Sequence, residues 1–243
     1  GRSCCLNYCP KVLVPIVVIV ESYHDSGFNA ASQKTRPRHP HRHRQRIHSL
    51  RLLDRFLVVA EKQRIPAVIV ANKIDLVENA RATFGLYEPL GYHVIYSSTK
   101  TGAGVDELTA ALAGRISALA GPSGVGKSSL LNVIQPGLGL AINEINIVAN
   151  KGRHTTVSRQ LIPLAGGGYV ADTPGWKSLA LWDTEPEEME AYFPELAPLV
   201  MDCQFNDCSH THEPGCAVLA ALKAGTIHPQ RYESYLRLKA GQD

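Results

Sequence analysis

The run Gly121-Pro122-Ser123-Gly124-Val125-Gly126-Lys127-Ser128 constrains the fold of this 243-residue chain more than any other feature. Its pattern, Gly-x4-Gly-Lys-Ser, lets the backbone wrap so that the N–H groups point inward at a phosphate. Such a loop lies between a strand and a helix, because the positive end of the helix dipole also faces the anion. We therefore expect a strand at 117–120, a helix from 128 to 134 and an α/β fold around the loop.

The residues of this loop have separate roles in holding a nucleotide. Lys127 places a cation between the β- and γ-phosphates, and the Ser128 hydroxyl is a magnesium ligand. The glycines permit close approach of the backbone. The predicted phosphate-binding residues are Gly121, Pro122, Ser123, Gly124, Val125, Gly126, Lys127, Ser128 and Ser129.

Two later segments supply the remaining parts of a magnesium and γ-phosphate site. In Asp172-Thr173-Pro174-Gly175, Asp172 would hold magnesium through water, and the Gly175 N–H would reach the γ-phosphate. A switch loop that senses the γ-phosphate also needs a threonine to complete the magnesium shell. Thr155 and Thr156 are the candidates, with Thr156 preferred as the magnesium ligand.

A base-reading loop, Asn72-Lys73-Ile74-Asp75, follows an apolar strand at 67–70. The Asp75 carboxylate can accept hydrogen bonds from N1–H and the 2-amino group of guanine, whereas adenine would leave it unpaired. The stem of Lys73 can stack over the base. Ser98, Thr99 and Lys100 are predicted to form the second base loop, in which a backbone N–H meets guanine O6. The predicted ligand is GTP with Mg²⁺, and an ATP-using kinase is disfavoured.

The base-reading loop precedes the phosphate loop, which reverses their order in ordinary small GTPases. All parts of a GTP site are present in rotated order, so the sequence predicts a circularly permuted GTPase. Strands alternate with helices, among them a predicted helix at 105–116 and a hairpin of 161–162 with 169–170. This alternation favours a mostly parallel sheet with helices on both faces.

A cluster of sulfur and imidazole ligands lies near the carboxyl terminus. Cys203-x4-Cys208-x-His210-x5-Cys216 offers three thiolates and one imidazole, a tetrahedral zinc set without an open position, so we interpret it as one structural ion. His212 is an alternative to His210. Beyond the cluster, an amphipathic helix is expected to expose Arg231, Arg237 and Lys239, either as an RNA-facing surface or as a plain helix face.

The first 48 residues do not have the pattern of a domain. Lys34–His48 holds six Lys or Arg residues and no acid, although the whole chain has a net charge of only +3. We expect a disordered basic arm; an RNA-contacting arm and a stretch foreign to the native protein are alternatives. Val12–Val20 is too short for a membrane span and is interpreted as a buried strand.

Taken together, the motifs resemble the RsgA (YjeQ/YloQ) family of circularly permuted GTPases. The resemblance runs from about Leu52 to the carboxyl terminus and includes Leu53–Leu57, the loops above, Gly152–Thr156 and Asp172–Trp176. It implies an OB-fold, a permuted GTPase domain and a zinc domain that uses His210. Here we expect an atypical segment at 1–48, the GTPase domain at 49–183, the zinc domain at 184–243 and no OB-fold. The first strand of the GTPase sheet could then be altered or missing.

The resemblance also implies a GTP hydrolase that acts on the small ribosomal subunit and its rRNA late in maturation. The position at which ordinary GTPases carry a water-orienting glutamine is Trp176, so His154 in the switch loop is the candidate catalytic residue. The alternative is a hydrolysis-impaired, GTP-dependent RNA-binding switch or a fragment. We expect a monomer without membrane contact, in a bacterial cytoplasm or in an organelle.

Overall fold

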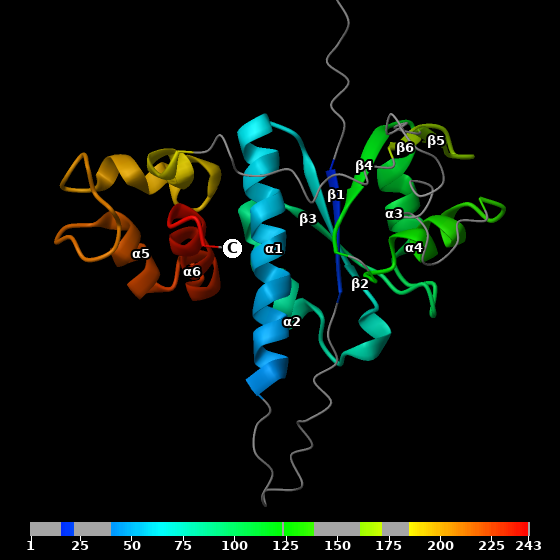
Figure 1. The fold of residues 1–243 in the computed structure, drawn as a ribbon, viewed down its shortest axis with the longest axis horizontal. Coiled ribbons are helices and arrows are strands. Elements are labelled where there is room, and N and C mark those ends of the chain that lie inside the picture. Colours follow the sequence, from blue (N-terminus) through cyan, green and yellow to red (C-terminus); the bar gives the residue numbers. More distant parts are fainter. Residues whose placement is uncertain (1–15, 22–39, 123, 139–160, 172–184, 243) are drawn as a thin grey trace, which may run out of the picture.

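The computed structural model describes residues 16–21, 40–122, 124–138, 161–171 and 185–242, with the backbone alone at 40–49. Figure 1 shows a sheet with its helices on one side of the long helix α1 (Pro40–Gln63) and a group of shorter helices on the other. Helix α1 therefore contacts both parts of the molecule, and it packs against strand β1 as well as helix α6.

The sheet has six strands in the order β3-β2-β1-β4-β6-β5, and all neighbours are parallel except the β5–β6 pair. The hairpin of β5 and β6 confirms the predicted pairing of these two segments. The strands are β1 (Ile16–Glu21), β2 (Ala67–Asn72), β3 (His93–Tyr96), β4 (Ile116–Ala120), β5 (Leu161–Pro163) and β6 (Tyr169–Ala171).

Strand β1 lies at the centre of the sheet, between β2 and β4. Ile16 to Val20 are at most 2% exposed, which confirms the buried strand expected in this region. Because β1 is present between β2 and β4, the first strand of the sheet is not missing, contrary to one of the expectations above. A continuous run of β-branched residues suits a central parallel strand that is buried on both faces, so its burial outweighs the polar composition around it.

Helix α1 also begins earlier than expected, at Pro40, so the backbone of 40–48 is helical rather than disordered. The other amino-terminal residues, 1–15 and 22–39, lie outside the described part of the chain. The expected absence of an OB-fold and the domain boundaries at 48/49 and 183/184 stay predictions.

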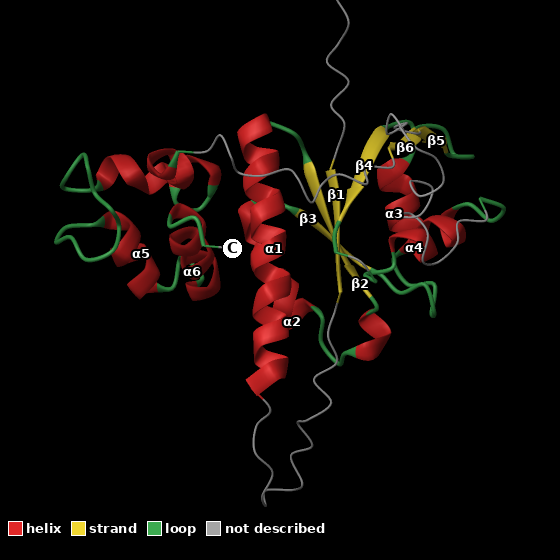
Figure 2. Ribbon diagram, viewed as in Figure 1, coloured by secondary structure: helices red, strands yellow, loops and turns green. Residues whose placement is uncertain are grey.

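Helices cover both faces of the sheet, as predicted (Figure 2). Alternate β1 side chains point to opposite faces: Ile16, Val18 and Val20 join a core with α1 and α2, whereas Val17 and Ile19 join a core with α3 and α4. The helical elements on these faces are α1, α2 (Arg81–Phe84), α3 (Val105–Leu112) and α4 (Lys127–Ile134), with short 3-10 helices η1 (Ile74–Leu76) and η2 (Gly85–Leu90).

Helix α3 ends at Leu112, four residues before the predicted end. Gly114 has a φ of 68°, a conformation that a helix interior does not tolerate, and Ile116 is the first residue of β4. The apolar spacing that carried the prediction through to Ile116 is therefore a coincidence of two adjacent elements.

The carboxyl-terminal part is helical and has its own core. Its elements are η4 (Pro186–Tyr192), η5 (Ala197–Asp202), α5 (Ala217–Ala224) and α6 (Pro229–Lys239). Val58 of α1 enters this core beside Phe193 and Tyr235, so the two parts share one packed interface.

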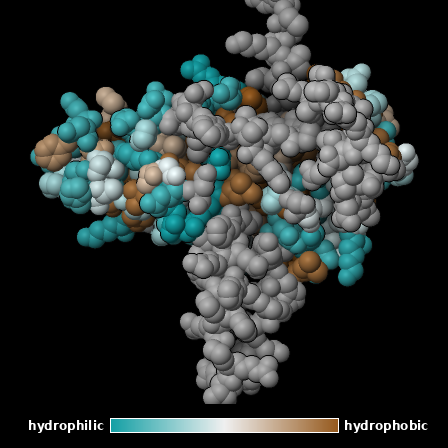
Figure 3. All heavy atoms as spheres, viewed as in Figure 1, coloured by the Kyte–Doolittle hydropathy of each residue, from teal (hydrophilic) through white to brown (hydrophobic). Residues whose placement is uncertain are grey.

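The surface of the carboxyl-terminal helices is mostly hydrophilic on the face that Figure 3 shows, with isolated apolar side chains among the polar ones. The large apolar side chains exposed in the described residues include Met201 at 90% and Phe205 at 42%. Among the described helices, none has the length and apolar character needed to cross a membrane.

Candidate nucleotide site and metal centre

The base-reading loop and the phosphate loop lie side by side at the carboxyl edge of the parallel strands. Asn72 ends β2, and its buried Nδ2 donates to the carbonyl oxygen of Val125 over 2.8 Å, across 53 residues of sequence. The Ser97 hydroxyl donates to Asn72 Oδ1 over 3.2 Å, which fixes the orientation of the amide. A buried amide with both ends satisfied is costly to displace, so the two loops form one unit.

Two glycines of the phosphate loop are required by close backbone approach. Gly126 has a φ of 99°, and a Cβ there would lie 2.4 Å from Asn72 Nδ2. Gly121 has a φ of 138°, and its Cβ would lie 2.2 Å from the carbonyl oxygen of Ile19 in β1. Any side chain at these positions would push the loop away from the sheet and from the base-reading loop.

Helix α4 begins at Lys127, directly after the loop, as the motif requires. The ammonium group of Lys127 donates to the carbonyl oxygens of Gly121 (2.7 Å) and Pro122 (2.8 Å), which folds the side chain back across the loop. Ser128 is buried at 8% exposure in the first turn. The backbone N–H groups of this turn point toward the loop and can bind an anion together with the Lys127 cation.

The second base loop lies next to the first. The Ser98 hydroxyl donates to Asp75 Oδ1 over 2.5 Å and accepts from the backbone N–H groups of Lys100 (3.2 Å) and Thr101 (3.3 Å). Ser98 is buried, whereas Asp75 is exposed and keeps acceptor capacity for a ligand. The structure thus brings together Asn72, Asp75, Ser98, Thr99 and Lys100, as the sequence predicts.

Lys73 joins the base-reading loop to two other elements. Its ammonium group donates to Glu21 Oε1 of β1 over 2.7 Å and to the carbonyl oxygen of Gly124 over 2.8 Å. Its backbone is left-handed, with φ 61° and ψ 39°. Glu21 belongs to none of the predicted motifs, and only the strand pairing of β1 with β2 reveals its place beside Lys73.

Several predicted site residues lie outside the described residues. They are Ser123 of the phosphate loop, His154, Thr155 and Thr156 of the switch loop, and Asp172 and Gly175 of the aspartate turn. Their roles in catalysis, magnesium binding and γ-phosphate sensing stay predictions.

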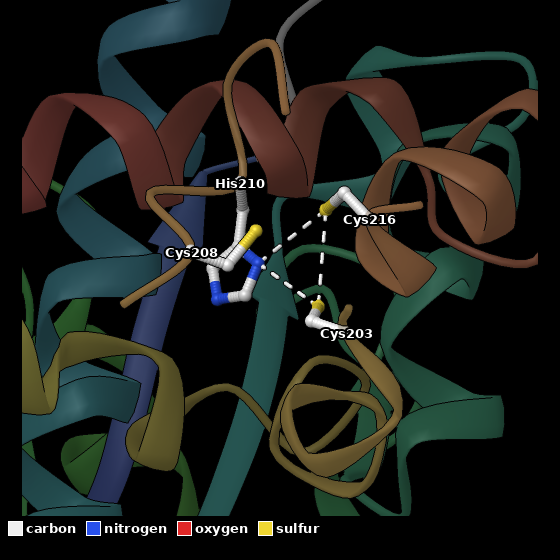
Figure 4. Close-up of side chains that lie close together, drawn as sticks. All are labelled: Cys203, Cys208, His210 and Cys216. Atoms are coloured by element: carbon white, nitrogen blue, oxygen red, sulfur yellow. Dashed lines mark hydrogen bonds between the residues drawn. The ribbon is translucent and has the colours of Figure 1, made fainter. Parts of the chain in front are cut away.

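The four predicted zinc ligands meet in one cluster. One donor atom from each of Cys203, Cys208, His210 and Cys216 lies within 4.8 Å of every other. Figure 4 shows the His210 ring among the sulfur atoms, with Nδ1 3.6 Å from Cys203 Sγ and 3.5 Å from Cys216 Sγ. Nδ1 is therefore the ring nitrogen that faces the sulfur atoms and could coordinate a metal with them. His212, the alternative ligand, is exposed and binds Thr211 instead.

The chemistry of these donors fits a metal ion. Burial raises the pKa of the Cys208 thiol to about 12, with the neighbouring Cys216 and Cys203 acting in the same direction. Burial lowers the pKa of His210, which keeps the imidazole neutral and able to coordinate. A divalent cation would reverse the penalty on the thiolates, and three thiolates with one imidazole match the preference of Zn²⁺.

The surrounding residues hold the ligands in place. His210 has a left-handed backbone (φ 63°), and its carbonyl oxygen accepts from the Tyr232 hydroxyl of α6 over 2.6 Å. The Glu213 carboxylate accepts from the backbone N–H groups of Ser209, Thr211 and His212 and so closes the ligand loop. The hydroxyl of Ser209 also donates to Glu213, and this bond lowers the pKa of the carboxyl group.

The sequence predicted that Arg231 is exposed, and this prediction is wrong. Its side chain is 1% exposed and binds Asp54 of α1 and Glu195, because α6 packs on α1 with this face inward. Arg237 pairs with Glu233, and Lys239 lies 3.7 Å from Glu190. The three cations thus bind carboxylates of the chain itself, which favours the plain helix face over an RNA-facing surface.

Comparisons with known proteins find similar proteins of one family. A family model described as "RsgA GTPase" matches residues 44–182. The chain is 50% identical over 191 residues to "Small ribosomal subunit biogenesis GTPase RsgA" of Gemmatimonas aurantiaca, which covers 78% of this chain. It is 52% identical over 192 residues to the protein of the same name from Moorella thermoacetica, which covers 79% of this chain. The chain spans 62% and 66% of the lengths of these two relatives.

Two solved structures are similar over almost the whole chain. The crystal structure of YjeQ from Thermotoga maritima has a TM-score of 0.70 at 36% identity and covers 94% of this chain, which in turn covers 71% of that one. The crystal structure of YloQ, described as a circularly permuted GTPase, has a TM-score of 0.67 at 30% identity, with coverages of 95% and 68%. The predicted fold class, including the rotated order of the motifs, is confirmed.

Proposed function

The chain belongs to the RsgA GTPase family, and on that premise we propose that it binds GTP with Mg²⁺ and hydrolyses it during maturation of the small ribosomal subunit. The observation that carries this proposal is the buried bond between Asn72 Nδ2 and the Val125 carbonyl oxygen. It fixes the distance between a guanine-reading carboxylate and a phosphate-binding loop, so a ligand must present both groups at once.

The roles of the described residues follow from their positions. Asp75 accepts from the guanine edge, and Ser98 orients that carboxylate through its 2.5 Å hydrogen bond. Lys127 and the first turn of α4 hold the β- and γ-phosphates, and the Ser128 hydroxyl is available for Mg²⁺. Thr156, with Thr155 as the alternative, and Asp172 would complete the magnesium shell; Gly175 would contact the γ-phosphate.

Hydrolysis needs a group that orients water, and His154 is our candidate. Trp176 stands where ordinary GTPases have glutamine, and an indole cannot accept a proton from water. A neutral imidazole in the switch loop can do so. The zinc cluster has no catalytic part in this proposal: Zn²⁺ held by Cys203, Cys208, His210 and Cys216 stabilises the carboxyl-terminal part.

The test is GTP hydrolysis by the chain, alone and with purified small ribosomal subunits, in parallel with His154→Ala. We expect the subunits to stimulate phosphate release. The stimulated rate of the variant should be at least about 100-fold lower than that of the unmodified protein. His93→Ala is the matched control, because His93 lies on β3 and pairs with exposed Glu107 away from the site. GTP must also displace a fluorescent guanine nucleotide better than ATP does.

Two results would contradict the proposal. Equal competition by ATP and GTP would exclude a guanine-specific site. Tight GTP binding without stimulation by the subunits would leave the hydrolysis-impaired switch as the function.

A further inference from the structure

Glu21 is the last residue of β1, the central strand, and its strand partner in β2 is Asn72. Its carboxylate therefore lies at the edge of the sheet where the base-reading loop begins. The side chain is 24% exposed, and Lys73, its partner at 2.7 Å, is 31% exposed. The two groups are partly shielded from water, so their hydrogen bond is charge-assisted and only weakly screened.

Lys73 is held at both ends. The backbone is left-handed, a conformation that is unfavourable for a residue with a Cβ, and the Ile74 N–H fixes it by donating to the Ser97 carbonyl oxygen over 3.1 Å. The ammonium group is held by Glu21 on one side and by the Gly124 carbonyl oxygen on the other. The four-carbon stem between these anchors has lost most of its rotamers before any ligand arrives.

We propose that Glu21 is a positioning residue for guanine-nucleotide binding, which fixes the Lys73 stem in the orientation that covers the purine face. This inference rests on the proposed function. A free lysine would have to be ordered when the base binds, and the cost would appear as weaker affinity.

The effect of Glu21 should be the same for every guanine ligand, because the contact concerns the base and not the phosphates. Calorimetric titration of guanosine, GDP and GTP separates this effect from long-range electrostatics. We expect Glu21→Gln to weaken all three affinities by the same factor, about three- to tenfold. Removal of a negative charge acting only through the field would instead strengthen GTP binding and leave guanosine unchanged.

Two further variants test whether Glu21 acts on nucleotide affinity through Lys73. Glu21→Asp keeps the charge but shortens the side chain by one methylene, so its carboxylate no longer reaches Lys73. We expect this variant to weaken the three affinities almost as much as Glu21→Gln does. In a Lys73→Met background, Glu21→Gln should have no further effect on affinity, because the group that it positions is gone. An additive loss in this cycle would contradict the inference.

Glu107→Gln is the matched control, because Glu107 is an exposed carboxylate of α3 that lies 2.8 Å from His93 at the start of β3. It should leave all three affinities unchanged. Unaltered guanosine, GDP and GTP affinities in Glu21→Gln would mean that the pair is an ordinary surface contact and would overturn the inference. Failure of the unmodified protein to bind any guanine nucleotide would instead overturn the proposed function.

Discussion

Arg231 of α6 donates from Nη1 to Asp54 Oδ1 of α1 over 2.6 Å, and the two side chains are only 1% and 2% exposed. The same guanidinium binds both oxygens of Glu195 (2.6 and 3.1 Å), and Tyr87 donates to Asp54 over 2.6 Å. The next residue, Tyr232, holds the carbonyl oxygen of the metal ligand His210. One turn of α6 thus connects the metal centre to the helix that covers the sheet.

The charges of this network depend on one another. Burial raises the pKa of Asp54, whereas the Arg231 guanidinium and the hydrogen bond from Tyr87 act in the opposite direction. Burial alone would lower the pKa of Arg231, but the two carboxylates raise it, so the cation persists at all accessible pH values. Removal of either partner would leave an uncompensated buried charge.

We therefore expect Arg231→Met to reduce the free energy of unfolding by about 3–5 kcal/mol, as measured by urea denaturation. Arg237→Met is the control, because Arg237 is 39% exposed and pairs with Glu233 at the surface. The control should change stability by less than about 1 kcal/mol. Equal changes in the free energy of unfolding for the two substitutions would show that the buried network stabilises the fold no more than a surface ion pair does.

Gly126→Ala should uncouple the base-reading loop from the phosphate loop. The new Cβ would displace the Asn72 amide, leaving buried polar groups unpaired at a cost of about 1–3 kcal/mol, so GTP affinity should fall about 10- to 100-fold. Gly137→Ala introduces a side chain at a similar φ of 102°, where nothing lies within 4 Å. The control therefore measures backbone strain alone, and its GTP affinity should match that of the unmodified protein.

Asp75→Asn should change the preference for bases. An amide can accept only one of the two guanine hydrogen bonds and places a donor against the other, so GTP affinity should fall by about 100-fold. Competition binding with GTP and ATP measures the change. Asp106→Asn, at the exposed start of α3, tests whether loss of any nearby carboxylate has the same effect; comparable losses would exclude base reading by Asp75.

Removal of the metal should destabilise the carboxyl-terminal part first. We expect one zinc ion per chain by elemental analysis, and a chelator should lower the melting temperature by about 10 °C or more. Cys208→Ser should lower it similarly without any chelator. A protein that contains no metal after purification in zinc, or that melts unchanged in chelator, would exclude a structural zinc site.

The metal-free protein should also become sensitive to alkaline pH. The folded pKa of Cys208 is about 12, above its ordinary value of 9.0, because burial penalises the thiolate. Folding therefore gains from the neutral thiol below pH 9, and this stabilisation is lost as the pH rises from about 9 to about 12. Melting curves of the chelated protein should show this decrease in stability between about pH 9 and about pH 12. In the zinc-loaded protein the thiolates are already ionised, so its melting temperature should not fall for this reason.

The sequence predicted the parts of the site that depend on local pattern. The loop at 121–128 spans eight residues and the ligands from Cys203 to Cys216 span fourteen, so short sequence patterns were enough to predict both. The strand order β3-β2-β1 could not be derived in this way, since Ile16–Glu21 is separated from its partner β2 by a long segment of unrelated composition.

Contacts across long sequence separations account for the errors. Arg231 lies on a helix whose charge pattern is typical of an exposed face, and only its packing on α1, 177 residues away, brings it beside Asp54. Glu21 likewise contacts Lys73 across 52 residues of sequence, and no local pattern indicated this contact. A charged residue carries no local sign of the partner that will bury it, so its environment emerged only from the folded structure.

The central place of β1 also governs the order in which the molecule can form. A chain made from its amino terminus completes β1, β2 and β3, and with them both base loops, before β4 and the phosphate loop exist. Until then one edge of β1 lacks its partner strand, with its backbone groups available for pairing with other chains. The rotated motif order therefore places the base loops early in synthesis and the phosphate loop later, when β4 covers the open edge of β1 and only β5 and β6 remain to be added.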